Sequence, residues 1–280
     1  MPEGPEVRRQ ADRIRKAMEG RRLDRVTFAA VRLQDWQPEL SGRRLLSVDP
    51  RGKAILFRFE GGLTIYTHGQ LMGRWRVFAI GREPSLHRSL RLGLETALHG
   101  VHLYSAFDID VLDDQELVHH PFLTRLGPDV LDDTTTPEDI RQQLRRFARR
   151  SLAALLLDQR LAAGIGNYLR SEILFEAGIR PELRPVDLSA QRLDRLAQAI
   201  LDVPRRSYRT GGITVDNELA ALQRREGVPR RRMRHFVFNR SEEPCRRCGT
   251  PIERGELSGR RIYVCPGAKF SGERLLRCDG

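Results

Sequence analysis

Ala163-Gly164-Ile165-Gly166-Asn167-Tyr168-Leu169 is the segment that decides how the middle of this chain folds, because it follows one helix-like run and opens another. Its two glycines permit close approach of another backbone. The N–H groups of a helix start can hold a phosphate, with Asn167 as an added donor. Glycine in such a place is more often a simple helix C-cap. The segment alone therefore leaves a phosphate-binding turn and a C-cap as alternatives.

Helical signals lie on both sides of this turn. Upstream, Thr136-Pro137-Glu138-Asp139 combines a Thr cap, a Pro at the first helical position and an acid at the third, which predicts a helix start. Downstream, apolar residues from Leu193 to Leu201 follow the spacing of a helix packed on one side, which Pro204 should end. We expect a helical domain over 125–235, in which the Gly- and Arg-rich stretch 209–235 is a loop.

The N-terminal part of the chain has a different pattern. Apolar residues from Val7 to Ala17 recur with helical spacing, which predicts a leading helix over Glu6 to Met18. Short apolar runs bounded by Gly, Asp and Pro follow, and they predict a β-sandwich or barrel over 1–124. The fold class is therefore α+β and multidomain. The predicted strands are Ala54–Phe59, Leu63–Thr67, Trp75–Ile80, Leu90–Glu95 and Val101–Tyr104.

All four cysteines lie in the last 36 residues, and in a reducing compartment this clustering favours metal binding over disulfides. Cys245-x2-Cys248 is followed, after 16 residues, by Cys265-Pro266-Gly267, which is the spacing of a zinc ribbon. The sequence thus predicts a zinc finger over 236–280 that holds one structural Zn²⁺.

The fourth zinc ligand departs from the ribbon spacing. Ala268 stands at its expected position, so Cys278 from the tail, a water or another group must complete the site. A redox dithiol is an alternative use of Cys245 and Cys248. Pro244-Cys245-x-x-Cys248 also matches half of a nucleobase deaminase signature, but no His-x-Glu lies upstream, which excludes that class.

The charge of the chain favours a polyanionic partner. Its 49 Lys and Arg against 37 Asp and Glu leave a net charge of +12. Residues 205–280 hold 18 basic and nine acidic side chains, although a solvated arginine-rich surface would have the same composition. No signal peptide is evident, and Asp158 and Arg160 interrupt the most apolar run. We therefore expect a cytoplasmic protein without a membrane span.

The basic residues comprise 46 Arg and only three Lys, at Lys16, Lys53 and Lys269. The simplest interpretation is a GC-rich genome, which writes Arg codons wherever any cation suffices. A lysine that persists under such a bias can supply what a guanidinium cannot, because an amine can lose its proton and act as a base or nucleophile.

The N-terminus, Met1-Pro2-Glu3-Gly4-Pro5-Glu6, offers chemistry of its own. Removal of Met1 would give Pro2 a secondary amine with a pKa near about 8, so part of it is unprotonated at neutral pH. Such an amine can attack a sugar C1′, and Glu3 can protonate the opened sugar oxygen. The alternative is that Pro2 only permits processing and Glu3 only caps a helix.

Together these segments resemble the formamidopyrimidine-DNA glycosylase and endonuclease VIII family of bifunctional base-excision repair enzymes. The likeness extends from Pro2-Glu3-Gly4-Pro5-Glu6 to Cys265-Pro266-Gly267, with order and spacing kept. Within the family, Arg51-Gly52-Lys53-Ala54 and Thr67-His68-Gly69-Gln70-Leu71-Met72-Gly73-Arg74-Trp75 look closer to bacterial endonuclease VIII. The turn around Asn167 then looks like a helix-two-turn-helix rather than a C-cap.

The resemblance implies a role for each matching residue. Pro2 would be the Schiff-base nucleophile and Glu3 the proton donor, while Lys53 would serve β-elimination and Arg260 δ-elimination. Positions implied to contact DNA are Gln70, Leu71, Met72, Arg125 and Asn167, and those implied to bind zinc are Cys245, Cys248, Cys265 and, in place of the family's last cysteine, Cys278.

The resemblance also implies a partner and a reaction. We expect a monomeric, nucleoid-associated enzyme that removes oxidised bases, chiefly pyrimidines, from damaged double-stranded DNA and cuts the strand by β,δ-elimination. Oxidised or ring-opened purines are the alternative substrates. A catalytically silent damage binder is an alternative function, and a zinc-ribbon transcription or RNA factor would leave the N-terminal residues unexplained.

Overall fold

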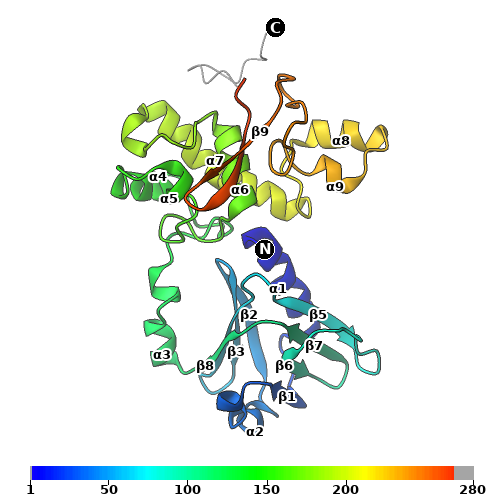
Figure 1. Cartoon of the computed structure of the whole chain (residues 1–280). Coiled ribbons are helices and arrows are strands. Elements are labelled where there is room, and N and C mark those ends of the chain that lie inside the picture. Colours follow the sequence, from blue (N-terminus) through cyan, green and yellow to red (C-terminus); the bar gives the residue numbers. More distant parts are fainter. Residues whose placement is uncertain (1, 268–280) are drawn as a thin grey trace. The chain divides into compact units, whose positions relative to one another are not determined.

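The computed structural model describes residues 2–267 and divides the chain into two compact units (Figure 1). Unit 1 ends at Arg125 and unit 2 begins at Leu126. Unit 2 contains both the predicted helical domain and the cysteine-bearing segment. Within residues 2–267, no helix has both the length and the apolar character that a membrane span requires.

Unit 1 is a β-sandwich with one leading helix, as predicted. Two antiparallel four-stranded sheets, in the orders β2-β3-β4-β8 and β1-β6-β7-β5, enclose an apolar core to which α1 contributes Val7, Ala11 and Ile14. The strands are β1 (Arg25–Phe28), β2 (Leu45–Arg51), β3 (Ala54–Phe59), β4 (Thr64–His68), β5 (Arg74–Ala79), β6 (Leu90–Glu95), β7 (His99–Tyr104) and β8 (Asp108–Leu112). The helices are α1 (Gly4–Met18), η1 (Val31–Leu33), α2 (Trp36–Leu40), α3 (Asp114–His119) and η2 (Leu123–Arg125).

Helix α1 runs antiparallel to strand β2. The N–H of Gly20, just beyond the helix, donates to the Leu45 carbonyl at 2.8 Å, at the start of β2. Further back along the helix, Arg15 Nη2 donates to the Val48 carbonyl at 2.5 Å, in the middle of β2. The beginning of α1 therefore lies toward the end of β2.

Unit 2 combines helices with a C-terminal β-hairpin. Buried residues of α6 and α7 form a large part of its main core, and Ile262 of the hairpin joins them. A second core unites Phe175 of α6, Phe236 and the cysteines Cys245 and Cys265, so the cysteine-bearing segment packs on the helices. The elements are α4 (Pro137–Arg146), α5 (Leu152–Leu155), α6 (Asn167–Ala177), η3 (Pro185–Asp187), α7 (Ala190–Arg209), α8 (Asn217–Arg225), α9 (Arg230–Met233), β9 (Glu253–Leu257) and β10 (Arg260–Val264).

The predicted start of α4 is confirmed by its hydrogen bonds. The Thr136 N–H donates to Asp139 Oδ2 at 2.8 Å, and the Asp139 N–H donates back to Thr136 Oγ1 at 3.3 Å. Pro137 occupies the first turn.

The prediction that Pro204 ends its helix is wrong. Helix α7 continues to Arg209 with Pro204 buried inside it. The residues after the proline have packing partners: Ser207 Oγ lies 3.0 Å from the buried Tyr168 hydroxyl, and Tyr208 packs against the main core. These contacts offset the roughly 3 kcal/mol that a proline costs within a helix.

The prediction of a loop over 209–235 is also wrong, because α8 and α9 lie within it. Asp216 caps α8 by accepting the Leu219 N–H at 2.8 Å, and Pro229 precedes α9. The many arginines in this stretch leave too few apolar residues for a helical pattern to show, so neither short helix was predicted.

Candidate active site

Pro2 and Glu3 immediately precede helix α1. Glu3 is the N-cap residue and is only 3% exposed, whereas Pro2 is half-buried. The Glu3 N–H donates to Glu6 Oε2 at 3.1 Å, and the Glu3 carbonyl accepts from Val7 at 3.0 Å. The positive end of the helix dipole favours a carboxylate at this point. Glu3 thus caps the helix and also places a buried acid next to Pro2.

Lys53 lies in the tight turn between β2 and β3. Arg51 pairs with Ala54, so Gly52 and Lys53 form a two-residue hairpin connection. Gly52 has φ 58°, the left-handed conformation that such a turn needs at its first position and that glycine adopts without strain. The turn holds Lys53 at one end of the sheet.

The geometry of α1 and β2 brings these groups to the same end of unit 1. Glu3 precedes Arg15 by 12 residues, a rise of about 18 Å along a helix. Lys53 follows Val48 by five residues, which is about 17 Å along an extended strand. Arg15 contacts Val48, and the helix and the strand are antiparallel. The similar distances from this contact to Glu3 and to Lys53 therefore place both residues at the same end of unit 1. We call this region, with Pro2, Glu3 and Lys53, the Pro2 end.

The loop 69–73 starts from the same end. Ala54 pairs with His68, the last residue of β4, and His68 pairs with Asp108, the first of β8. Burial lowers the pKa of His68 below its ordinary value, and the charge of Lys53 lowers it further, against the opposing effect of Asp108. This electrostatic coupling agrees with Lys53 and His68 lying near each other.

Two glycines close this loop. The Gly73 N–H donates to the Gly69 carbonyl at 2.8 Å, and a Cβ at Gly73 would lie 2.5 Å from that oxygen. Between them Gln70 adopts φ 45°, and Leu71 and Met72 are 63% and 58% exposed. The loop therefore presents three solvated side chains, two of them apolar.

The other predicted DNA contacts lie on both units. Arg125 is the exposed last residue of η2 in unit 1. In unit 2, Gly166 is the N-cap of α6 and Asn167 its first residue, so the glycine begins a helix rather than ending one. Arg260 is exposed at the start of β10. The Tyr263 N–H of β10 donates to Ser171 Oγ of α6 at 3.3 Å, so the elements that carry Asn167 and Arg260 pack together.

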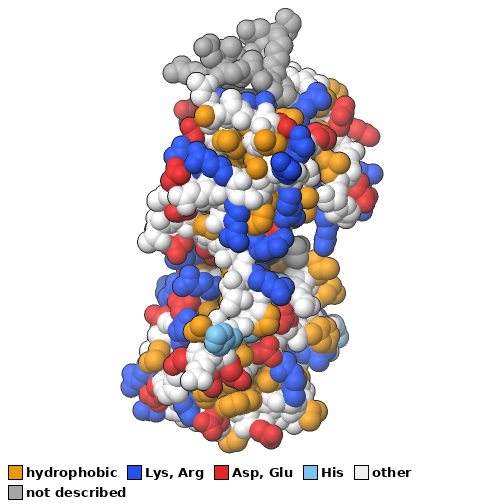
Figure 2. All heavy atoms as spheres, turned by 90° about the vertical axis from the view of Figure 1, so that its left-hand side faces the viewer, with side chains coloured by type: hydrophobic (Ala, Val, Ile, Leu, Met, Phe, Trp, Pro, Cys, Tyr) orange, Lys and Arg blue, Asp and Glu red, His pale blue; other side chains and the backbone are white. Residues whose placement is uncertain are grey.

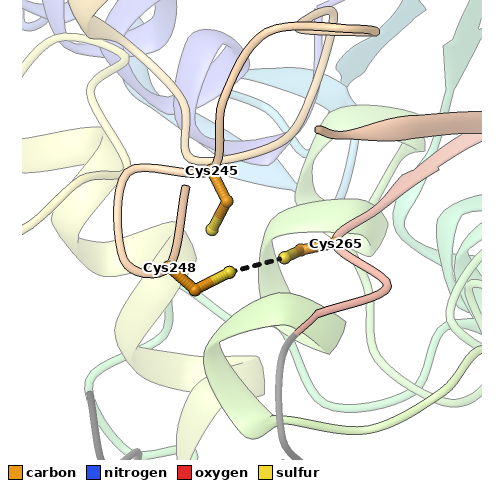
Figure 3. A group of neighbouring side chains, drawn as sticks. All are labelled: Cys245, Cys248 and Cys265. Atoms are coloured by element: carbon orange, nitrogen blue, oxygen red, sulfur yellow. Dashed lines mark hydrogen bonds between the residues drawn. The ribbon is translucent and has the colours of Figure 1, made fainter. Parts of the chain in front are cut away.

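Three cysteines converge within unit 2 (Figure 3). The sulfur atoms of Cys245, Cys248 and Cys265 lie within 4.8 Å of one another, and Cys248 Sγ lies 3.3 Å from Cys265 Sγ. Sulfur ligands of a tetrahedral zinc ion, each about 2.3 Å from the metal, are about 3.8 Å apart. The three thiols thus form a possible metal site. Ala268 and Cys278 lie outside the described residues.

The sequence assigned no role to two further residues. His68 lies in the quoted stretch Thr67–Trp75, but its position near Lys53 emerges only from strand register. Glu172, 1% exposed in α6, accepts the Phe236 N–H with Oε2 and the Val237 and Phe238 N–H groups with Oε1, each at 2.9 Å. It therefore fixes the segment that leads to the cysteines. No local signal in the sequence marks Glu172, because α6 also contains Arg170, Ser171 and Glu176.

Comparison with known proteins gives matches over most of the chain. The formamidopyrimidine-DNA glycosylase N-terminal domain family matches residues 1–108, and the formamidopyrimidine-DNA glycosylase H2TH domain family matches residues 126–218. Endonuclease 8 of Klebsiella pneumoniae is 47% identical over 271 residues, which are 96% of this chain and 100% of that protein. Endonuclease 8 of Escherichia coli K12 is 46% identical over 271 residues, with the same coverage of both chains.

Solved structures share the fold. The complex of Lactococcus lactis Fpg with DNA containing an abasic site has a TM-score of 0.78 at 21% identity, over 94% of this chain and 98% of that one. The predicted fold class and family resemblance are both confirmed. With two family domains and relatives at nearly half identity over their full length, the chain belongs to the formamidopyrimidine-DNA glycosylase family, alongside the bacterial endonucleases 8.

Proposed function

We propose that this chain is a bifunctional DNA glycosylase and AP lyase that removes oxidised pyrimidines from damaged double-stranded DNA in base excision repair. The observation that carries the proposal is the Pro2 end. There an N-terminal imino acid, a buried carboxylate and a turn lysine lie at one end of the sandwich, with the exposed loop 69–73 beside them.

The chemistry follows from these groups once Met1 has been removed. The lone pair of the Pro2 nitrogen forms a bond to C1′, and the base leaves with the electrons of its glycosidic bond. The nitrogen then loses its proton, which neutralises the departing base. Glu3 gives a proton to the ring oxygen as the sugar opens, which leaves an iminium ion at C1′. The iminium acidifies the C2′ proton, Lys53 assists its removal, and the 3′ phosphate leaves by β-elimination. A second elimination, assisted by Arg260, releases the 5′ phosphate.

The loop 69–73 supplies what base extrusion needs. A base in a stacked duplex must be flipped out before C1′ can be attacked, at a cost of a few kcal/mol. Gln70, Leu71 and Met72 would fill the gap in the stack, while Arg125 and Asn167 would hold phosphates. On the face drawn in Figure 2, each unit presents many Lys and Arg side chains, with acidic side chains interspersed. Such a surface suits a DNA backbone.

Borohydride trapping tests the proposal. Reduction of the iminium should give a stable covalent complex between the protein and DNA that contains an abasic site, joined through Pro2. A Pro2→Gly variant should give little complex. If the wild-type protein forms no adduct, the chain is a silent damage binder instead.

A panel of duplexes, each with one lesion, tests the substrate class. We expect thymine glycol to be excised at least about tenfold faster than 8-oxoguanine, since one mismatched contact in a flipped-base pocket alters a rate by about this factor. The measurement is the rate of base release under single-turnover conditions. Faster release of 8-oxoguanine or of a ring-opened purine would reassign the substrate to the purine class.

We further propose that Cys245, Cys248 and Cys265 hold a structural Zn²⁺. Thiolates are ligands that zinc prefers, and the spacing of the three sulfurs fits a tetrahedral ion. The purified protein should contain one zinc per chain, and Cys245→Ser should lose it and lower the Tm by several degrees. A zinc content that survives Cys278→Ser would remove Cys278 from the ligand set.

Arg260→Ala should change the products of strand cleavage. Its loss should leave base release nearly unchanged but shift the product from the δ-eliminated to the β-eliminated end, because only the second elimination depends on the guanidinium. Product ends are resolved by denaturing gel electrophoresis. Arg261→Ala, a neighbouring exposed arginine, is the matched control and should keep the wild-type ratio.

A further inference from the structure

Arg170 is the largest fully buried side chain described in the chain, with an exposed fraction of 0%. It lies in α6, one turn after Asn167. A guanidinium is always protonated and has five donors and no acceptor, so burying it is costly unless neighbouring oxygens receive its N–H groups. The oxygen atoms that accept its hydrogen bonds therefore indicate which parts of the structure the buried guanidinium holds in place.

One of these oxygens belongs to Asn167. Arg170 Nη2 donates to Asn167 Oδ1 at 2.9 Å. Because the guanidinium can only donate, it fixes the carbonyl end of the Asn167 amide toward Arg170, so the opposite end of the amide is Nδ2, which can only donate. A phosphate oxygen can only accept. The pairing thus holds the amide in the one orientation that can bind phosphate.

Other oxygens belong to the β9–β10 hairpin. Arg170 Nη2 also donates to the Arg261 carbonyl at 2.8 Å and the Arg260 carbonyl at 3.3 Å, and Nη1 lies 3.4 Å from the Leu257 carbonyl. A further bond from Nη1 reaches Ala153 of α5 at 2.9 Å. One side chain therefore joins the first residue of α6 to the backbone of Arg260.

We propose that Arg170 is a positioning residue for the repair reaction, which holds the Asn167 amide with its donors directed away from Arg170 and sets the position of Arg260, so that the two act on the DNA backbone as one unit. The inference rests on the proposed function, in which Asn167 holds a phosphate and Arg260 assists the second elimination. Arg170, being buried, acts only through them.

A double-mutant cycle tests the link to Asn167. The probe is a duplex with a stable abasic-site analogue, so that binding is measured without reaction. In the wild-type background, Asn167→Ala should weaken binding about tenfold, the effect of one charged hydrogen bond. In an Arg170→Met background the same change should cost less than about twofold, because the amide has already lost its orientation.

The product ratio tests the link to Arg260. Arg170→Met should raise the share of β-eliminated product, as Arg260→Ala does, whereas a general loss of structure would slow every step alike. Arg170→Lys keeps the charge but has no planar fork to span Asn167 and the hairpin together, so it should show an intermediate ratio and partial coupling. It also keeps the test open if the Met variant does not fold.

Arg205→Met is the matched control. Arg205 also bridges two backbone carbonyls in unit 2, those of Asp132 and Thr135 at 2.9 Å each. Among residues 2–267, it forms no hydrogen bond to Asn167 or the hairpin. It should lower the Tm yet leave the cost of Asn167→Ala and the product ratio unchanged. Additive effects of Arg170 and Asn167, with an unchanged ratio, would overturn the inference. If Asn167→Ala leaves the binding affinity of the otherwise wild-type protein unchanged, the proposed contact between Asn167 and DNA is wrong.

Discussion

Glu3→Gln is expected to lower the single-turnover rate of base release about a thousandfold, within the range for loss of a general acid. The variant keeps the size and the hydrogen-bonding oxygen of the side chain, and either residue suits the beginning of a helix. Only the transferable proton is lost. The sugar of an abasic site opens to its aldehyde without the enzyme, so strand cleavage at a preformed abasic site should fall much less.

Asp12→Asn is the control for this experiment. Asp12 lies on the same helix and forms ion pairs with Arg8 and Arg15, but it is two turns away from the Pro2 end. Its loss should cost at most about 1 kcal/mol of stability, as for exposed ion pairs, with no change in rate. Wild-type base release by Glu3→Gln would contradict the proton-donor role.

Lys53→Arg is expected to preserve DNA binding while lowering the rate of strand cleavage about a hundredfold, as for loss of a general base. The positive charge remains, so attraction to phosphate is kept. Arginine, however, cannot give up its proton at neutral pH. Binding to a duplex with a stable abasic analogue and single-turnover cleavage of an abasic duplex measure the two properties separately.

Lys16→Arg is the matched control, because Lys16 is exposed on α1 and belongs to no proposed site. It should leave both measurements unchanged. Full cleavage activity in Lys53→Arg would show that Lys53 persists for reasons other than its proton.

Local signals in the sequence predicted part of this fold well. The Thr136 cap and the strands Ala54–Phe59 and Leu90–Glu95 have the predicted positions. Strand β2 was not predicted, because Asp49-Pro50 has the composition of a turn. Proline is tolerated there because β2 is an edge strand, whose pairing with β3 leaves its other side without a partner strand.

The candidate site divides in the same way. Pro2, Glu3 and Lys53 could be chosen from their chemistry, but their common location depends on the antiparallel packing of α1 on β2, which no local pattern encodes. The same holds for Arg170: in the sequence it is one of 46 arginines, and only tertiary structure distinguishes a buried one. These residues are identified by contacts between segments far apart in the sequence, and a local hydrophobic pattern cannot predict such contacts.

The glycine-closed loop has a consequence for altering what the protein recognises. Its backbone is fixed by the bond between Gly69 and Gly73, while the side chains of Leu71 and Met72 have few contacts with the core. The two glycines thus determine the shape of the loop, whereas Leu71 and Met72 determine which groups it presents. The two apolar positions can therefore be substituted at little cost in stability, which would alter the groups that the loop presents to its partner, provided that both glycines are retained.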